Sequence, residues 1–259
     1  MRIAASIEYD GRPYSGWQIQ DGVKTVQGEV EKALSKVADH PVRVICAGRT
    51  DTGVHAVNQV IHFDTTAMRS DYSWVRGANT HLPESICLSW AKPVSDRFHA
   101  RFMARRRSYR YVIINRPIRS AYLAGKVTWQ YRPLDEVKMA TAAQFLVGEH
   151  DFTSYRALAC QAKSPLRIMY SLEVFRSGEF VYLDVCANAF LHHMVRNIAG
   201  VLMTIGAGEK PVEWAKEVLE HRDRCRGGIT APAAGLYLAK VDYDAEFDLP
   251  QGSPLPSYG

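Results

Sequence analysis

Residues 42–56 have the sequence VRVICAGRTDTGVHA, an apolar stretch that runs into a polar loop between two glycines. Apolar side chains at every second position from Val42 to Cys46 predict a strand. Gly48 and Gly53 then bracket the loop, and glycine permits the sharp turns and close backbone approaches that such a loop needs. The pattern therefore predicts a sheet with polar side chains presented at its edge.

The same periodicities recur outward along the chain. Alternating runs predict strands at residues 3–9, 106–114 and 236–243, and a hairpin over 169–187. Apolar residues three and four apart predict helices at 26–37, 134–148, 194–205 and from Pro211 onward. Most strand pairs are joined by hairpins or long mixed segments, so we predict an α+β fold.

We predict two similar lobes, each a mostly antiparallel sheet with helices on one face. The segment from Asn115 to Pro133 has mixed polarity and two prolines, which favours a junction. The predicted lobes are residues 1–115, with the polar loop and a basic segment, and residues 116–259.

Composition sets the class of protein. The 259 residues are 47% hydrophobic and 23% charged, which excludes a disordered chain. Five scattered cysteines without a Cys-x-x-Cys pair argue against a zinc site or a disulfide scaffold, and favour reduced thiols. Acidic residues at Glu8 and Asp10 interrupt any signal-peptide core, and no run of about 18 apolar residues occurs. We expect a cytoplasmic protein without membrane contact.

The polar loop places Arg49, Asp51 and His55 within seven residues. Such crowding suggests a functional carboxylate, whereas the simpler alternative is an aspartate that hydrogen-bonds its own turn. A Walker phosphate loop is excluded because no Gly-Lys-Ser/Thr follows. Among weaker features, Asp10 and Asp71 are predicted as turn residues, and Trp17 lines a groove or packs in the core.

A basic segment follows at residues 97–111, RFHARFMARRRSYRY. Between residues 97 and 110 it has no acid and six arginines: Arg97, Arg101, Arg105, Arg106, Arg107 and Arg110. Arginines bind phosphates and stack on bases, and the interleaved aromatic rings can stack on extruded bases. A solvated basic edge strand is the alternative. Because the whole chain has a net charge of only +5, this concentration favours RNA or DNA as partner.

A third feature is His192-His193 followed by Arg196, predicted at the start of a buried helix. Adjacent residues of a regular helix point about 100° apart, so the two histidines would not chelate one ion. A buried guanidinium requires an anionic partner, and no acid lies within a turn on that helix. Asp51 is the candidate partner.

Six ordered blocks of this sequence resemble the tRNA pseudouridine synthase A family over nearly the whole chain. They are residues 8–20 (EYDG..Y.GWQ.Q), 47–56 (AGRTDTGVHA), 98–101 (FHAR) leading to Tyr109 and Tyr111, 151–156 (DFTSYR), 187–197 (ANAFLHHMVRN) and 231–238 (APAAGLYL). Thr52 departs from the family pattern, which often has alanine there, and Ser108 is a second variation. Both changes are small.

The resemblance implies an enzyme that converts uridine to pseudouridine at positions 38, 39 and 40 of the tRNA anticodon stem-loop. It implies a homodimer that uses one aspartate, Asp51, without cofactor or metal. It also implies a central RNA-binding cleft between the two predicted lobes, which residues 116–259 complete. By the same resemblance, Arg49 aids extrusion of the target nucleotide, Tyr109 stacks on the uracil, Arg196 pairs with the catalytic carboxylate and Leu236 contacts the base.

The chemistry of this reaction agrees with a single acid. Pseudouridine formation breaks the N1–C1′ bond and forms a C5–C1′ bond, without oxidation or added water, whereas most glycosidases use a second carboxylate. The carboxylate would add to C6 of uracil, add to C1′ of ribose or remove a proton from C2′; the sequence does not choose among these. A non-catalytic RNA-binding protein and a nucleoside hydrolase are the alternative functions.

Overall fold

The computed structural model describes residues 1–250, 252 and 255–258. The chain forms two compact units. Unit 1 contains residues 1–106 and 237–255, and unit 2 contains residues 107–236 and 256–259. The C-terminal part of the chain is divided between the units. The strand that begins at Leu236 passes from unit 2 into unit 1, and the chain returns to unit 2 at residue 256.

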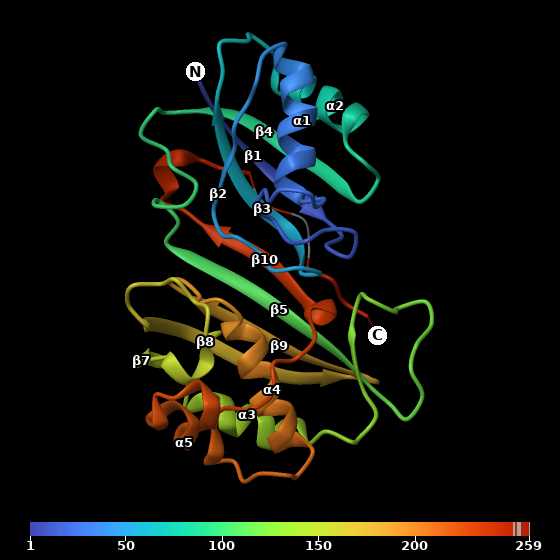
Figure 1. Cartoon of the computed structure of the whole chain (residues 1–259), viewed down its shortest axis with the longest axis vertical. Helices are drawn as coiled ribbons and strands as arrows, with labels where there is room; N and C mark the ends of the chain where they lie inside the picture. The colour runs from blue at the N-terminus through green and yellow to red at the C-terminus, as the bar shows by residue number, and fades with distance from the viewer. Residues whose placement is uncertain (251, 253–254, 259) are drawn as a thin grey trace. The chain divides into compact units, whose positions relative to one another are not determined.

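Unit 1 is built on strands in the order β4-β1-β3-β10, with β2 paired to β3 (Figure 1). Their bounds are β1 Arg2–Tyr9, β2 Ile45–Cys46, β3 His55–Asp64, β4 Ile86–Val94 and β10 Leu236–Asp242. Neighbours are antiparallel except β3 and β10, which run parallel and pair Tyr237 with His55. The interior strand β3 starts four residues after Asp51, so the centre of this sheet positions the polar loop.

Two helices complete unit 1, α1 (Val26–Ala38) and α2 (Asp71–His81), which pack together, with α2 on β4. Thr25 caps α1 by accepting a hydrogen bond from the backbone of Gly28 at 3.3 Å. The helix buries an apolar stripe that includes Val26, Val30 and Leu34, as its spacing predicted.

Unit 2 has strands in the order β5-β9-β8-β7, all antiparallel, with β6 parallel to β5. Their bounds are β5 Arg106–Asn115, β6 Thr128–Gln130, β7 Gly148–Asp151, β8 Leu166–Ser177 and β9 Phe180–Ala187. Helix α3 packs on β8, and α4 and α5 pack on α3 (Figure 1). These helices are α3 Glu136–Gln144, α4 Met194–Gly206 and α5 Trp214–His221. Short 3₁₀ turns lie at 153–155, 224–226, 233–235 and 245–247.

The α+β class and the mostly antiparallel pairing are confirmed. The strand predicted from Val42 is wrong in extent, since only Ile45 and Cys46 are paired. Side chains of α1 accept hydrogen bonds from backbone amides that would otherwise bond to a neighbouring strand. Ser35 Oγ accepts from the Val42 amide at 2.9 Å, and Glu31 Oε1 accepts from the Val44 amide at 3.0 Å.

Asp71 is not a turn residue, because it opens α2 directly after the N-cap Ser70, whose side chain accepts a bond from the Ser73 amide. Trp17 is a core aromatic with 1% of its surface exposed. The helix predicted at 134–148 is shorter, spanning 136–144. Within the described part of the chain, the helices are too short or too polar to cross a bilayer.

Helix α4 touches the backbone of the segment that precedes β10. A Cβ atom added at Gly200 would lie 1.9 Å from the carbonyl oxygen of Ile229. We predict that Gly200→Ala lowers the free energy of unfolding by about 1–3 kcal/mol, because overpacking outweighs the better helix propensity of alanine. Chemical denaturation measures the change. Thr204→Ala, one turn along the same helix, is the control and costs under about 1 kcal/mol; a Gly200→Ala protein as stable as this control would contradict the close contact.

Candidate active site

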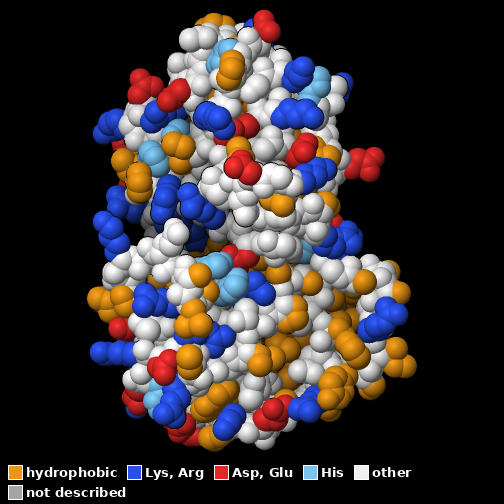
Figure 2. Space-filling view, in the orientation of Figure 1, with side chains coloured by type: hydrophobic (Ala, Val, Ile, Leu, Met, Phe, Trp, Pro, Cys, Tyr) orange, Lys and Arg blue, Asp and Glu red, His pale blue; other side chains and the backbone are white. Residues whose placement is uncertain are grey.

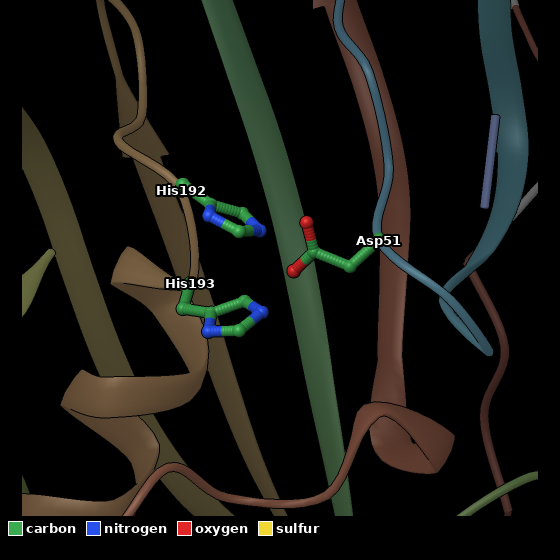
Figure 3. A group of neighbouring side chains, drawn as sticks. All are labelled: Asp51, His192 and His193. Atoms are coloured by element: carbon green, nitrogen blue, oxygen red, sulfur yellow. The ribbon is translucent and has the colours of Figure 1, made fainter. Parts of the chain in front are cut away.

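Asp51 lies on the loop between β2 and β3 (Figure 3). Its side chain is half-buried, and Arg49 is exposed. The loop closes in a turn in which the Val54 amide donates to the Asp51 carbonyl at 3.1 Å. Gly53 has a φ of 78°, a left-handed conformation that favours glycine. The second bracketing glycine of the sequence motif therefore serves the turn that holds Asp51.

A second segment, residues 9–17, holds this loop through three hydrogen bonds. The hydroxyls of Tyr9 and Thr50 lie 2.7 Å apart in the interior, and the Trp17 amide donates to the Thr50 carbonyl at 3.0 Å. On the other side of Asp51, the Gly11 amide donates to His55 Nδ1 at 3.1 Å. Asp51 is thus flanked by two anchored residues, and we call these three bonds the loop clamp.

Backbone packing makes the loop clamp tight. A Cβ atom on Gly11 would lie 2.0 Å from the carbonyl oxygen of Val54. One on Gly16, whose φ is 85°, would lie 2.8 Å from the carbonyl oxygen of Thr50. Both glycines are therefore required by close approach to the loop, which explains why the resembling block at 8–20 accompanies the block at 47–56.

His55 is buried and connects the loop to its surroundings. Its ring stacks on Tyr237 with centroids 4.6 Å apart and planes at 19°. A carboxylate oxygen of Asp10 lies 3.3 Å from His55 Nδ1, and Asp10 also accepts a 2.9 Å hydrogen bond from Arg12 Nε. Burial acts to raise the pKa of the Asp10 carboxyl, but Arg12 and His55 outweigh it and the pKa is lowered.

In unit 2, Tyr109 lies on β5 opposite Val185 of β9. The residue is 9% exposed, and its ring meets that of Phe190 edge to face, with centroids 5.0 Å apart. Two residues on, and thus on the same side of the strand, Tyr111 is fully buried. Burial raises the pKa of the Tyr111 hydroxyl, although Thr128 and Arg196 act against it.

Arg196 is held by the segment before β10. Its Nε donates to the Ala231 carbonyl at 2.8 Å, and the Ala231 amide donates back to the Arg196 carbonyl at 3.1 Å. The Tyr111 hydroxyl donates to the Pro232 carbonyl at 2.8 Å. Leu236, 5% exposed, follows this segment directly. Unit 2 therefore ties α4, β5 and the 231–236 segment into one framework.

His192 and His193 lie on the segment that leads into α4 (Figure 3). The prediction that they begin the helix is wrong, because α4 starts at Met194 and His193 is its N-cap. His193 has a φ of 61°, which is uncommon for a residue with a Cβ atom. The two rings lie 4.0 Å apart.

The six arginines of the basic segment have different surroundings. Three form ion pairs with acids that are distant in the sequence: Arg97 with Glu246, Arg105 with Asp244 and Arg110 with Asp184. Arg107 is buried and donates to the Asn188 carbonyl at 2.9 Å. Arg101 and Arg106 are exposed. The absence of acids within residues 97–110 therefore does not mean that these arginines lack acidic neighbours.

The predicted site residues are divided between the units. Unit 1 contains Arg49, Asp51, Arg97, Arg101, Arg105 and Arg106, and unit 2 contains Arg107, Tyr109, Arg110, Arg196 and Leu236. Sequence reasoning missed Tyr9 and Thr50 in the loop clamp and Ala231 beside Arg196. The signal available for them was their position inside the resembling blocks.

The chain is similar to several known proteins over most of its length. The tRNA pseudouridine synthase family model matches residues 5–103 and 142–244, a range that includes Asp51 and Arg196 but not Tyr109. A tRNA pseudouridine synthase A of Pseudomonas aeruginosa is 59% identical over 251 residues, covering 96% of this chain and 88% of its own. The enzyme of Coxiella burnetii is 56% identical, and the match covers 96% of this chain and 96% of the relative. The enzyme of Legionella pneumophila is also 56% identical, and the match covers 100% of this chain and 98% of the relative.

The chain therefore belongs to the tRNA pseudouridine synthase family. It is an enzyme of the isomerase class.

The loop clamp can be tested by a double-mutant cycle on Tyr9 and Thr50. Tyr9→Phe and Thr50→Val should each lower the free energy of unfolding by about 1 kcal/mol, since each removes the same buried hydrogen bond. The double variant should lose less than the sum, by at least about 0.5 kcal/mol. Tyr9→Phe combined with Ser85→Ala, which removes the separate Tyr14–Ser85 bond, is the additive control. Additivity in the Tyr9–Thr50 pair would contradict the clamp.

Proposed function

We propose that this enzyme converts uridine to pseudouridine at positions 38, 39 and 40 of the tRNA anticodon stem-loop, with Asp51 as its one catalytic carboxylate and no cofactor or metal. The observation that best supports the proposal is Asp51 on a clamped loop inside the region that matches the family model. Relatives that share more than half of their residues with this chain are named tRNA pseudouridine synthase A.

The reaction requires no redox partner. The N1–C1′ bond breaks, the uracil rotates, the C5–C1′ bond forms, and the proton on C5 is lost while N1 gains one. Atoms and electrons balance within the nucleotide, so one general base or nucleophile suffices. Addition of Asp51 to C6, its addition to C1′ and proton removal from C2′ each satisfy this balance.

The other residues take supporting roles in the proposal. The target nucleotide must leave the helical stack, at a cost of a few kcal/mol, and the exposed Arg49 fills the gap. Tyr109 stacks on the freed uracil, and Leu236 supplies an apolar contact. Arg196 pairs with the Asp51 carboxylate; the Ala231 carbonyl already orients its guanidinium.

The substrate interface follows from exposure and charge. Arg97, Arg101, Arg105 and Arg106 are exposed and contact phosphates, whereas the less exposed Arg107 and Arg110 mainly fix local structure through the Asn188 carbonyl and Asp184. We further propose that the two units act as lobes around a central RNA-binding cleft, and that the chain acts as a homodimer with tRNA across both subunits.

Asp51→Asn should abolish pseudouridine formation, because the amide is neither a base nor an effective nucleophile, while tRNA affinity stays within about threefold. Unmodified tRNA is incubated with enzyme, and carbodiimide adducts locate pseudouridine by blocked primer extension. Asp71→Asn, an exposed aspartate at the start of α2, is the matched control with wild-type rates.

The same assay separates the alternatives. Wild-type turnover by Asp51→Asn would remove Asp51 from the catalytic role. Binding without any pseudouridine from the wild-type enzyme would favour an RNA-binding protein, and release of free uracil would favour a hydrolase. Adducts outside positions 38–40 would contradict the proposed specificity.

Arg101→Ala and Arg106→Ala should each weaken tRNA binding and reduce the slope of log affinity against log salt by about one, the effect of one phosphate contact. Filter binding between 50 and 200 mM salt, the range over which such contacts are strongly screened, measures the slope. Arg69→Ala, an exposed arginine before α2, should leave it unchanged. Slopes equal to that of the control would place both side chains outside the RNA interface.

A further inference from the structure

The segment between β4 and β5 presents an aromatic ring to solvent. Phe102 is 74% exposed, and its ring stacks on His99 with centroids 4.3 Å apart and planes at 26°. One face of the ring is thus covered by His99. In Figure 2, hydrophobic and histidine side chains lie beside Lys and Arg side chains over this segment, at the left of the view.

The turn that presents Phe102 is fixed by hydrogen bonds. His99 Nδ1 accepts from the backbone amides of both Arg101 and Phe102 at 3.2 Å, and the Met103 amide donates to the His99 carbonyl at 3.0 Å. The adjoining Ala100 is buried; its amide donates to His62 Nδ1 at 3.1 Å. The ring is therefore oriented before any ligand arrives, which lowers the entropy lost on stacking.

The surroundings of the ring are positively charged. The Arg101 guanidinium lies 5.7 Å from the centre of the Phe102 ring. Burial lowers the pKa of His99, and the positive charges of Arg2 and Arg101 lower it further. An aromatic face beside a cation is complementary to a nucleobase joined to a phosphate.

The segment that carries this ring packs beside β2, which leads into the Asp51 loop. Ile45 of β2 pairs with His62 of β3, and the ring of His62 lies 4.8 Å from that of His99. Burial raises the pKa of the Cys46 thiol to about 12, while the positive charges of Arg49 and Arg101 oppose that rise. Both guanidiniums therefore act on one thiol, which precedes Asp51 by five residues. The segment that carries Arg101 and Phe102 is therefore fixed to the part of β3 that pairs with β2, the strand before the Asp51 loop.

We propose that Phe102 is a stacking platform for an unpaired base of the RNA substrate other than the target uridine, with Arg101 at the adjoining phosphate. The proposal rests on tRNA being the substrate. Stacking accepts any base, so the platform supplies affinity and register along the loop without reading sequence.

Exposed aromatic side chains elsewhere in unit 1 provide a comparison. Tyr72 on α2 is 68% exposed, and Arg76 lies 5.9 Å from its ring centre. This pair has the same chemistry as Phe102 and Arg101 but lies on α2, which packs on the edge strand β4, and β1 separates β4 from β3. Tyr72→Ala is therefore a matched control.

The test compares Phe102→Ala, Phe102→Trp and Tyr72→Ala for tRNA affinity and for KM and kcat of pseudouridine formation. Phe102→Ala should weaken tRNA binding and raise KM about tenfold, the loss expected for one stacked base, with kcat within about twofold. Phe102→Trp should restore binding, and its fluorescence should be quenched by tRNA more strongly than that of the wild type. Tyr72→Ala should match the wild type in every measurement.

The outcomes separate this proposal from the proposed function. A synthase in which Phe102→Ala keeps wild-type KM and affinity overturns the platform alone. If Phe102→Ala weakens tRNA binding and Phe102→Trp does not restore it, the ring does not act by stacking. If Phe102→Ala changes the molar mass of the protein in solution, the ring contacts another copy of the chain, and this result would contradict the platform. Absence of pseudouridine with wild-type enzyme overturns the proposed function, and tryptophan quenching by tRNA still decides whether the ring stacks on RNA.

Discussion

The packing of residues 9–17 against the Asp51 loop is the constraint on which the rest of unit 1 depends. Two glycines allow the backbones to touch, and the Tyr9–Thr50 bond and the His55–Gly11 bond hold the residues on either side of Asp51. A carboxylate at the end of a mobile loop would sample many orientations. Here the neighbouring backbone is fixed by the interior strand β3, so the position of Asp51 is determined before substrate binds.

Unit 2 uses a comparable device with different groups. The two hydrogen bonds between Arg196 and Ala231, together with the Tyr111–Pro232 bond, hold a helix, a strand and a connecting segment together. Arg196 is half-buried, and an anion stabilises a partly desolvated guanidinium, which agrees with its proposed role beside a carboxylate. In both units, backbone and side-chain groups that carry out no chemistry orient the residues proposed to do so.

Periodicity predicted the elements whose apolar pattern is local. Helix α1 and the β8–β9 hairpin follow directly from it. It failed where distant side chains compete for backbone groups, as Ser35 and Glu31 do for Val42 and Val44. The loop motif identified Asp51, whereas Thr50 resembles any loop threonine until its contact with Tyr9, 41 residues away, is known. The acids that pair with Arg97, Arg105 and Arg110 could likewise not be identified from the neighbouring sequence, because they are distant along the chain.

The central claim is that the Asp51 carboxylate meets an unstacked uridine. A crystal or cryo-EM structure of the wild-type enzyme with tRNA, trapped before turnover, tests it most directly. The account predicts that the target base lies outside the helical stack and that an Asp51 oxygen lies within about 3.5 Å of C6 of the uracil or of C1′ or C2′ of the ribose. A productive complex in which the target base stays stacked, or in which another carboxylate takes that place, would contradict it.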